Sequence, residues 1–125
     1  MGTDAFDATG TLFDPEAEGF IHTPHAIVEP GSPLEGVLAD SGTLESDAPN
    51  FMPLYIDSML LGIQGILDCG CDEPADIAEA VKAIDGFPGT SGDITYAGTT
   101  GIPPKAVDIV QNTEGAYNVL GTIGG

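Results

Sequence analysis

The longest regular pattern in the chain is an apolar stripe between residues 51 and 68. Hydrophobic side chains recur there at spacings that place them on one face of an α-helix. The stripe consists of Met52, Tyr55, Ile56, Met59, Leu60, Ile63, Ile66 and Leu67. We expect a helix over this stretch, with Asn50 as its N-cap and Gly70 marking its end.

Two glycines, Gly62 and Gly65, lie inside this predicted helix. Each costs roughly 1 kcal/mol relative to alanine, so packing must outweigh them. We interpret them as places where the helix backbone closely approaches a neighbouring sheet. The stretch is therefore predicted to be the central helix of an α/β layer, with its apolar stripe against that sheet.

Capping signals predict two shorter helices. Ser32 can cap a helix that has Pro33 in its first turn and Glu35 three residues after the cap. Pro74 begins a second helix, whose apolar side is formed by Ile77, Val81 and Ile84.

The remaining segments predict short strands joined by glycine- and proline-rich connections. Strands are expected at residues 19–22, 93–96, 106–110 and 116–123, with a hairpin turn at 112–115 and a flexible crossing at 86–92. Too few parallel strands are present for a self-contained doubly wound sheet. We therefore expect a partial α/β fold in which helices pack on a small mixed sheet, completed by dimerisation or by a partner segment.

The net charge of the chain argues against some classes of partner. The 125 residues carry 20 acidic side chains, two lysines and no arginine, for a formal net charge of −18. That charge repels phosphate backbones and anionic lipids, which argues against nucleic acid as a partner. The acids are scattered along the chain, which suits a solvated surface in a saline environment; an acidic face for a cationic partner is the alternative.

The sequence offers little for catalysis or for a cofactor. It contains no G-x-S-x-G, P-loop or G-x-G-x-x-G motif, so we expect no enzyme. Cys69 and Cys71 are too close in sequence for an ordinary disulfide without strain, and are interpreted as structural thiols or as a redox pair. A single Cys-x-Cys pair, with His22 and His25 far away in sequence, gives weak support for a metal.

The sequence matches neither the pattern of an export signal nor that of a membrane-spanning helix. The first ten residues lack the basic and apolar regions of an export signal, so any such signal is expected outside this stretch. The central helix is interrupted by Pro53, Asp57 and Gln64, and its apolar run is far shorter than the roughly 20 residues of a membrane span.

Several local patterns together resemble the last third of type I periplasmic solute-binding proteins, in the branch that serves branched-chain amino acid importers of the ABC class. Asp57 resembles the acid of a Tyr-Asp pair in that family, although Ile56 replaces the tyrosine. The other matching segments are Gly2-Thr3-Asp4, Ala17-Glu18-Gly19-Phe20, residues 77–84, Gly92-Asp93-Ile94-Thr95-Tyr96 and residues 107–115.

The resemblance implies a two-lobed receptor that closes over a small ligand. Residues 1–25 and 95–125 would be pieces of the second lobe, and residues 26–94 a piece of the first. It also implies an amino acid-like ligand, an ABC importer permease as partner and a periplasmic or extracellular location. The serine- and threonine-bearing loops that grip the ligand carboxylate in that family would lie outside this stretch.

Two ligand-binding residues follow from the resemblance. Asp4 resembles the acid that takes a ligand ammonium, and Phe51 resembles the aromatic wall of the pocket. The alternatives are a solvated turn residue for Asp4 and a hydrophobic contact for Phe51. Phe6 is a weaker candidate, and Tyr55 and Met59 are better explained as core.

Two other interpretations stay open. The chain could be a truncated, non-binding domain that self-associates, because missing strands leave sheet edges and apolar helix faces to be buried in a homo-oligomer. A sensor domain of a regulator would share the same fold.

The charge generates a prediction about salt. Self-repulsion among the unpaired carboxylates destabilises the compact state, and salt shortens the screening length from about 30 Å at 0.01 M to about 3 Å at 1 M. We expect the melting temperature, measured by circular dichroism, to rise between these NaCl concentrations, and KCl to act equally. A melting temperature that stays constant or falls would contradict this expectation.

Overall fold

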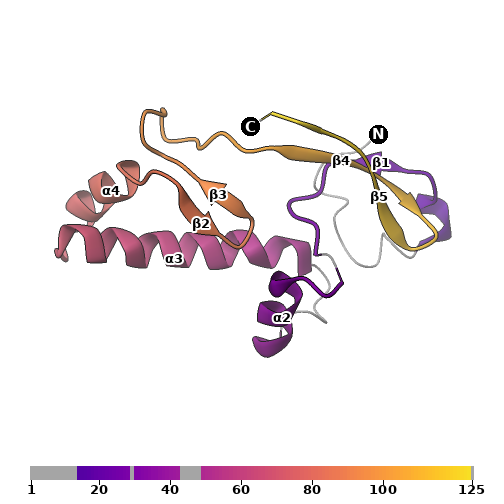
Figure 1. The fold of residues 1–125 in the computed structure, drawn as a ribbon, viewed down its shortest axis with the longest axis horizontal. Coiled ribbons are helices and arrows are strands. Elements are labelled where there is room, and N and C mark those ends of the chain that lie inside the picture. The colour runs from indigo at the N-terminus through magenta and orange to yellow at the C-terminus, as the bar shows by residue number, and fades with distance from the viewer. Residues whose placement is uncertain (1–13, 29, 43–48, 125) are drawn as a thin grey trace. The chain divides into compact units, whose positions relative to one another are not determined.

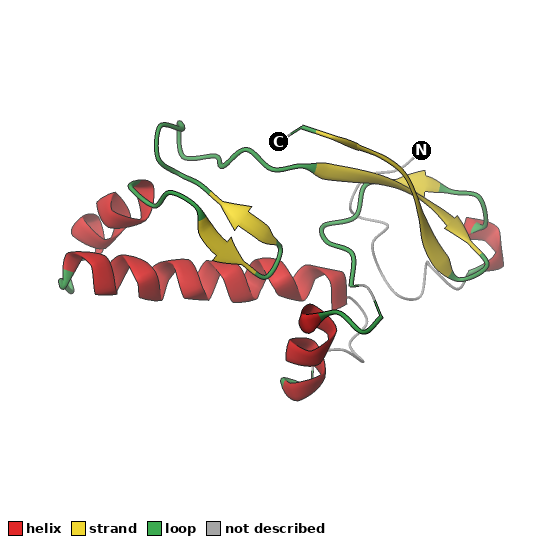
Figure 2. Ribbon diagram, in the orientation of Figure 1, coloured by secondary structure: helices red, strands yellow, loops and turns green. Residues whose placement is uncertain are grey.

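The computed structural model describes residues 14–28, 30–42 and 49–124. The chain divides into two compact units, one formed by residues 1–53 with 106–125 and the other by residues 54–105. Figure 1 gives the order of the elements along the chain, and Figure 2 separates helices from strands. The lobe boundaries expected from the sequence stay a prediction.

The first unit contains a three-stranded antiparallel sheet. It comprises β1 (Ile21–His22), β4 (Val107–Thr113) and β5 (Ala116–Ile123), in the order β1-β4-β5. The β4–β5 turn was predicted from sequence: Glu114 and Gly115 both have positive φ, at 53° and 76°, as a two-residue hairpin turn requires. Val110, at the centre of β4, is completely buried.

Two short helical segments belong to this unit. A 3₁₀ turn covers Pro15–Ala17, and α2 covers Pro33–Asp40. The Ser32 hydroxyl accepts a hydrogen bond from the Glu35 amide at 3.2 Å, which confirms the predicted cap. The Glu35 carboxylate, in return, accepts from the Gly31 amide at 2.7 Å, one residue before the expected position.

The second unit is built on the central helix, α3 (Met52–Cys69), which follows a 3₁₀ turn at Pro49–Phe51. With it pack α4 (Pro74–Lys82) and a hairpin of β2 (Phe87–Gly89) and β3 (Gly92–Ile94) (Figure 1). Its core consists of Leu61, Ile84 and Ile94, with Val81, Phe87 and Tyr96 packed against them. The partial α/β fold with helices on small sheets is confirmed, but the described strands form two antiparallel sheets in place of one mixed sheet.

Three details of the central helix differ from the sequence interpretation. Asn50 is not its N-cap, because it lies within the preceding 3₁₀ turn and its amide donates to the Tyr117 hydroxyl at 3.2 Å. Gly65 does mark a close approach, but to α4 and not to a sheet. Gly62 faces open space among the described residues.

Two further expectations were incomplete. The segment expected to be a flexible crossing contains β2, whose phenylalanine and proline pair with Ile94 and Asp93 of β3. The two cysteines form a disulfide with a Cα–Cα distance of 5.2 Å, which lies within the ordinary range despite the single intervening residue. The two cysteines are therefore joined in the structure, and a redox role for the pair stays a prediction.

No single helix in the described ranges has the length and hydropathy of a membrane span. Taken together, α3 and α4 would pass that test, but the chain bends by 103° between them.

The contact between α3 and α4 generates a matched pair of substitutions. A Cβ on Gly65 would lie 2.6 Å from Val81 Cγ2 and 3.2 Å from the Ile77 carbonyl oxygen. We expect Gly65→Ala to lower the free energy of unfolding by about 1–3 kcal/mol because the packed helices must move apart. Gly62→Ala has open space and should raise it by up to about 1 kcal/mol. Urea unfolding measures both; equal effects would contradict the helix contact.

Candidate functional site

The first candidate site is a group of buried polar side chains on one face of the three-stranded sheet. His22 on β1 is 1% exposed, and its ring centroid lies 5.4 Å from that of Tyr117 on β5, edge to face. The Tyr117 hydroxyl accepts the hydrogen bond from Asn50, which is also buried. Three segments far apart in sequence therefore bring imidazole, phenol and carboxamide groups together.

Asn112 adds a further polar group to this face. It lies on β4 opposite Tyr117, is 1% exposed, and neither polar atom of its carboxamide has a hydrogen-bond partner among the described residues. Its backbone is fixed, since its amide donates to the Phe20 carbonyl at 2.9 Å and its carbonyl accepts from Gly19 at 2.8 Å. A buried, unpaired carboxamide costs about 1–3 kcal/mol per group, so such groups call for a bound water or a ligand.

Phe51, predicted from the sequence as an aromatic wall, lies next to Asn50 at the end of the 3₁₀ turn. It is half-buried, and its ring centroid lies 3.9 Å from that of His25. The structure thus places Phe51 next in the chain to one member of the buried polar group, with its ring against that of His25. Asp4 and Phe6 lie outside the described residues, and the binding role of Asp4 and Phe51 stays a prediction.

The second unit holds a different polar cluster, centred on Asp57 of α3. This carboxylate is 2% exposed and accepts hydrogen bonds from the turn between β2 and β3. Thr90 donates to Oδ1 from its amide at 2.6 Å and from its hydroxyl at 2.8 Å. Ser91 donates to Oδ2 from its amide at 2.9 Å and also from its hydroxyl. The carboxylate therefore binds both residues of the turn to the helix.

Lys105 extends the cluster, because its ammonium group donates to the Ser91 hydroxyl. Burial lowers the pKa of Lys105, and the charge of Asp57 opposes that effect in part. For Asp57, burial would raise the pKa, but the hydrogen bonds from Ser91 and Thr90 outweigh it and hold the pKa below its ordinary value.

This arrangement favours a structural role over acid–base chemistry. A carboxylate whose pKa lies below its ordinary range stays ionised at neutral pH and is a weak base. The Ser91 hydroxyl donates its proton to Asp57 while it accepts from Lys105, so its oxygen is not directed at an open cavity. The cluster fixes the β2–β3 turn on α3.

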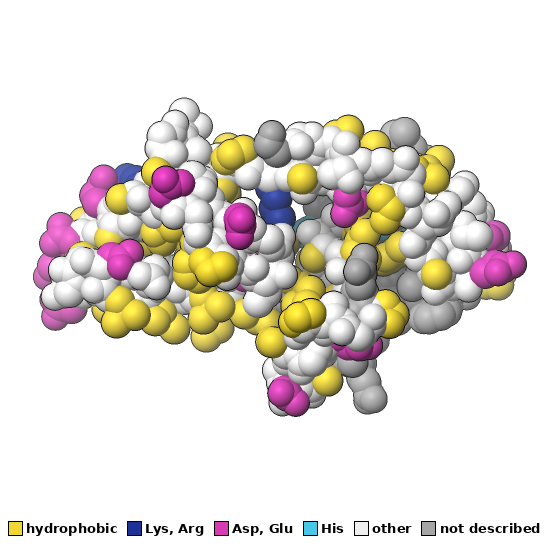
Figure 3. Space-filling view, viewed as in Figure 1, with side chains coloured by type: hydrophobic (Ala, Val, Ile, Leu, Met, Phe, Trp, Pro, Cys, Tyr) yellow, Lys and Arg dark blue, Asp and Glu magenta, His cyan; other side chains and the backbone are white. Residues whose placement is uncertain are grey.

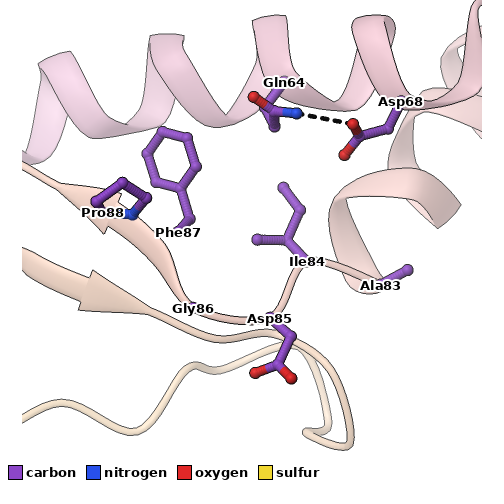
Figure 4. A pocket seen from close by; sticks show the side chains of 8 residues that line it. All are labelled: Gln64, Asp68, Ala83, Ile84, Asp85, Gly86, Phe87 and Pro88. Carbon is purple, nitrogen blue, oxygen red and sulfur yellow. Dashed lines mark hydrogen bonds between the residues drawn. The ribbon is translucent and has the colours of Figure 1, made fainter.

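A shallow pocket of about 440 Å³ lies elsewhere in the second unit (Figure 4). Gln64 and Asp68 line it from α3, joined by a hydrogen bond of 2.7 Å, and the remaining lining residues are Ala83, Ile84, Asp85, Gly86, Phe87 and Pro88. The Asp85 carboxylate accepts a hydrogen bond from the Thr95 hydroxyl at 3.2 Å and points away from Asp68 (Figure 4), so the two carboxylates do not face a common ligand. No spacing in the sequence marks these residues, which come from separate elements.

Two solved structures share the fold of this chain. The leucine-binding protein LivK from Thermotoga maritima superposes with a TM-score of 0.79 at 21% identity, covering 97% of this chain and 36% of its own. An ABC transporter solute-binding protein from R. palustris, in complex with benzoate, superposes with a TM-score of 0.65 at 17% identity, covering 86% and 31%. No family model and no curated protein matches the sequence.

The chain spans about a third of the length of these two structures. Its fold is that of part of a type I periplasmic binding protein, which confirms the resemblance that the sequence motifs indicated, at the level of the fold.

The Asp57 cluster generates a pH prediction. Because its pKa is lower in the folded chain than in the unfolded chain, Asp57 contributes stability above about pH 4 that is lost as the pH falls through the folded value. We expect Asp57→Asn to lower the free energy of unfolding by about 1–3 kcal/mol at pH 7 and by less at pH 3. Asp93→Asn, at an exposed position on β3, is the control. A loss of equal size at both pH values would show that the charge of Asp57 is not what matters.

Proposed function

We propose that this chain is part of the solute receptor of an ABC importer and contributes to binding an amino acid-like ligand outside the cytoplasm. Support comes from the fold, which is shared with a leucine-binding protein and with a solute-binding protein in complex with benzoate. Further support comes from the order of the sequence motifs. The importer permease is the partner that this role requires.

The observation that carries the proposal is the buried polar group beside Phe51. A small zwitterionic or polar ligand needs hydrogen-bonding groups shielded from water and an aromatic or apolar wall. The face with His22, Tyr117 and Asn112 supplies the first, and Phe51 supplies the second. The carboxamide of Asn112 can donate to a carboxylate and accept from an ammonium group.

Asp4 completes the proposed recognition of an amino acid. The carboxylate of Asp4 would pair with the ligand ammonium in a charge-assisted hydrogen bond. Ligands without an ammonium group, such as benzoate, would gain nothing from it. The preference between the two ligand types is therefore a measure of the role of Asp4.

Calorimetric titration tests the proposal. We expect heat at micromolar concentrations of leucine, isoleucine or valine, weaker binding of leucinamide, which lacks the carboxylate, and little binding of benzoate. Phe51→Ala should weaken binding about tenfold or more, since it removes an apolar contact. Asp4→Asn should reduce the preference for leucine over benzoate.

Matched substitutions control for general effects of charge and aromatic content. Tyr55→Ala removes an aromatic ring that is 62% exposed, and Asp72→Asn removes an exposed carboxylate. Both should leave the affinity unchanged. Absence of heat with every ligand, from a chain that is folded by circular dichroism, would overturn the proposal for this chain by itself.

The second candidate is a self-associating, non-binding domain, favoured by apolar side chains that α3 exposes to water, among them Met59 and Leu67 at 70% exposure each. In that case calorimetric titration with the ligands would give no heat of binding, and sedimentation would show a dimer whose population rises with protein concentration. The two candidates therefore give opposite pairs of results.

A further inference from the structure

The disulfide between Cys69 and Cys71 lies at the corner where α3 ends and the chain turns toward α4. It belongs neither to the buried polar group around Tyr117 nor to the Asp57 cluster. Because it closes a loop of only three residues, it removes less conformational entropy from the unfolded chain than a disulfide across a longer loop would. Its place in the sequence therefore gives little reason for a purely structural cross-link.

The corner between α3 and α4 is also held by contacts that do not involve the disulfide. Gly70 has a φ of 60°, and its amide donates to the Ile66 carbonyl at 2.9 Å, which ends the helix in a left-handed cap. At Gly65, α4 packs so closely on α3 that an added Cβ would lie 2.6 Å from Val81 Cγ2. Backbone conformation and helix packing therefore turn the chain here, and the corner should stay closed when the disulfide is reduced.

The two half-cystines differ in exposure and in electrostatic surroundings. Cys69 is exposed and is the last residue of α3, whereas Cys71 is half-buried. Exposure favours attack by an incoming thiolate on Sγ of Cys69. The negative end of the α3 dipole disfavours a negative charge on that same sulfur. Both effects favour a reaction in which Cys69 is attacked and Cys71 is the leaving group.

Carboxylates flank the disulfide in the sequence. Asp68 precedes it, Asp72 and Glu73 follow it, and all three side chains are exposed. In Figure 3, acidic side chains gather at the left-hand end of the second unit, where Figure 1 shows the turn between α3 and α4. The two lysines of the chain pair with Glu79 and with Ser91. Anionic thiols are therefore repelled from this corner, and neutral or cationic thiols are not.

We propose that the Cys69–Cys71 disulfide is a thiol–disulfide exchange site that oxidises neutral or cationic thiols. The sulfur of an incoming thiolate bonds to Cys69 Sγ while the Cys69–Cys71 bond breaks, and the electron pair leaves on Cys71 Sγ, which takes a proton from water. A second substrate thiolate then attacks the substrate sulfur of this mixed disulfide and releases Cys69. Two substrate thiols are thus oxidised to a disulfide while the protein disulfide is reduced to two thiols.

Trapping the intermediate tests which sulfur is attacked. Residues 1–125 are mixed with cysteamine, and N-ethylmaleimide stops the reaction at early times. Mass spectrometry of the digested chain should find cysteamine on Cys69 and the maleimide on Cys71. The double variant with Cys69→Ser and Cys71→Ser should form neither product. Full reduction by dithiothreitol should leave the circular dichroism spectrum of the wild-type chain folded.

A comparison of two thiols tests the choice of substrate. Cysteamine carries an ammonium group and no carboxylate, whereas glutathione is a net anion. At equal thiolate concentration and 0.01 M NaCl, we expect cysteamine to react at least about tenfold faster, because the local potential acts on the rate of encounter. The ratio should fall at 1 M NaCl, and also in a variant with Asp68→Asn, Asp72→Asn and Glu73→Gln. Asp93→Asn, on β3, is the matched control and should leave the ratio unchanged.

Four results would overturn the proposal. Absence of any mixed disulfide after hours in millimolar cysteamine would make the pair inert, and unfolding on reduction would make it a structural cross-link. A mixed disulfide that forms first on Cys71 would contradict the assigned direction of attack. Equal rates for the two thiols at low salt would contradict the role of the carboxylates. No outcome involves the amino acid-like ligand, so the proposed function stands or fails separately.

Discussion

The second unit depends on one carboxylate. Asp57 is buried in α3 and binds both residues of the β2–β3 turn through their amides and hydroxyls. Four donors offset the cost of taking the charge out of water, which would otherwise force the carboxyl to stay protonated. Once the turn is fixed on the helix, β3 directs Ile94 into contact with Leu61 and Ile84, and the small core can form. A polar clamp thus determines where the apolar residues of this unit meet.

The clamp explains why the helix has two unlike sides. The side covered by the chain itself holds an acid, a leucine and a glycine at four-residue intervals, and it is stabilised by hydrogen bonds and by close backbone approach at Gly65. The opposite side carries the continuous hydrophobic stripe. Hydrophobic periodicity correctly predicted α3 and placed its ends close to the observed ones. It was wrong about which face of α3 packs against the rest of this chain. An apolar stripe indicates which face of a helix is suited to burial. It does not indicate which segment covers that face.

Local signals predicted local structure well and long-range pairs poorly. The Ser32 cap, the start of α4 at Pro74 and the turn at Glu114-Gly115 were readable because the determining residues lie within four positions of one another. Strand β2 was missed because a three-residue Phe-Pro-Gly segment becomes a strand only by pairing with β3. For the candidate site, the sequence motifs singled out Phe51, but not Tyr117 or Asn112. Their significance comes from strand pairing and from a hydrogen bond to a residue 67 positions away.

The interactions of the two lysines affect how such an acidic chain can associate with another protein. Lys82 pairs with Glu79 at 2.5 Å on the surface of α4, and Lys105 is engaged by Ser91 in the Asp57 cluster. Both cationic side chains of the sequence thus have partners within the second unit, and the remaining carboxylates repel one another and any acidic neighbour. Association must then come from surfaces without charge, where the hydrophobic effect is not opposed at short range. The side of α3 that is free of acids meets this condition, and salt that screens the rest of the surface should strengthen contacts made there.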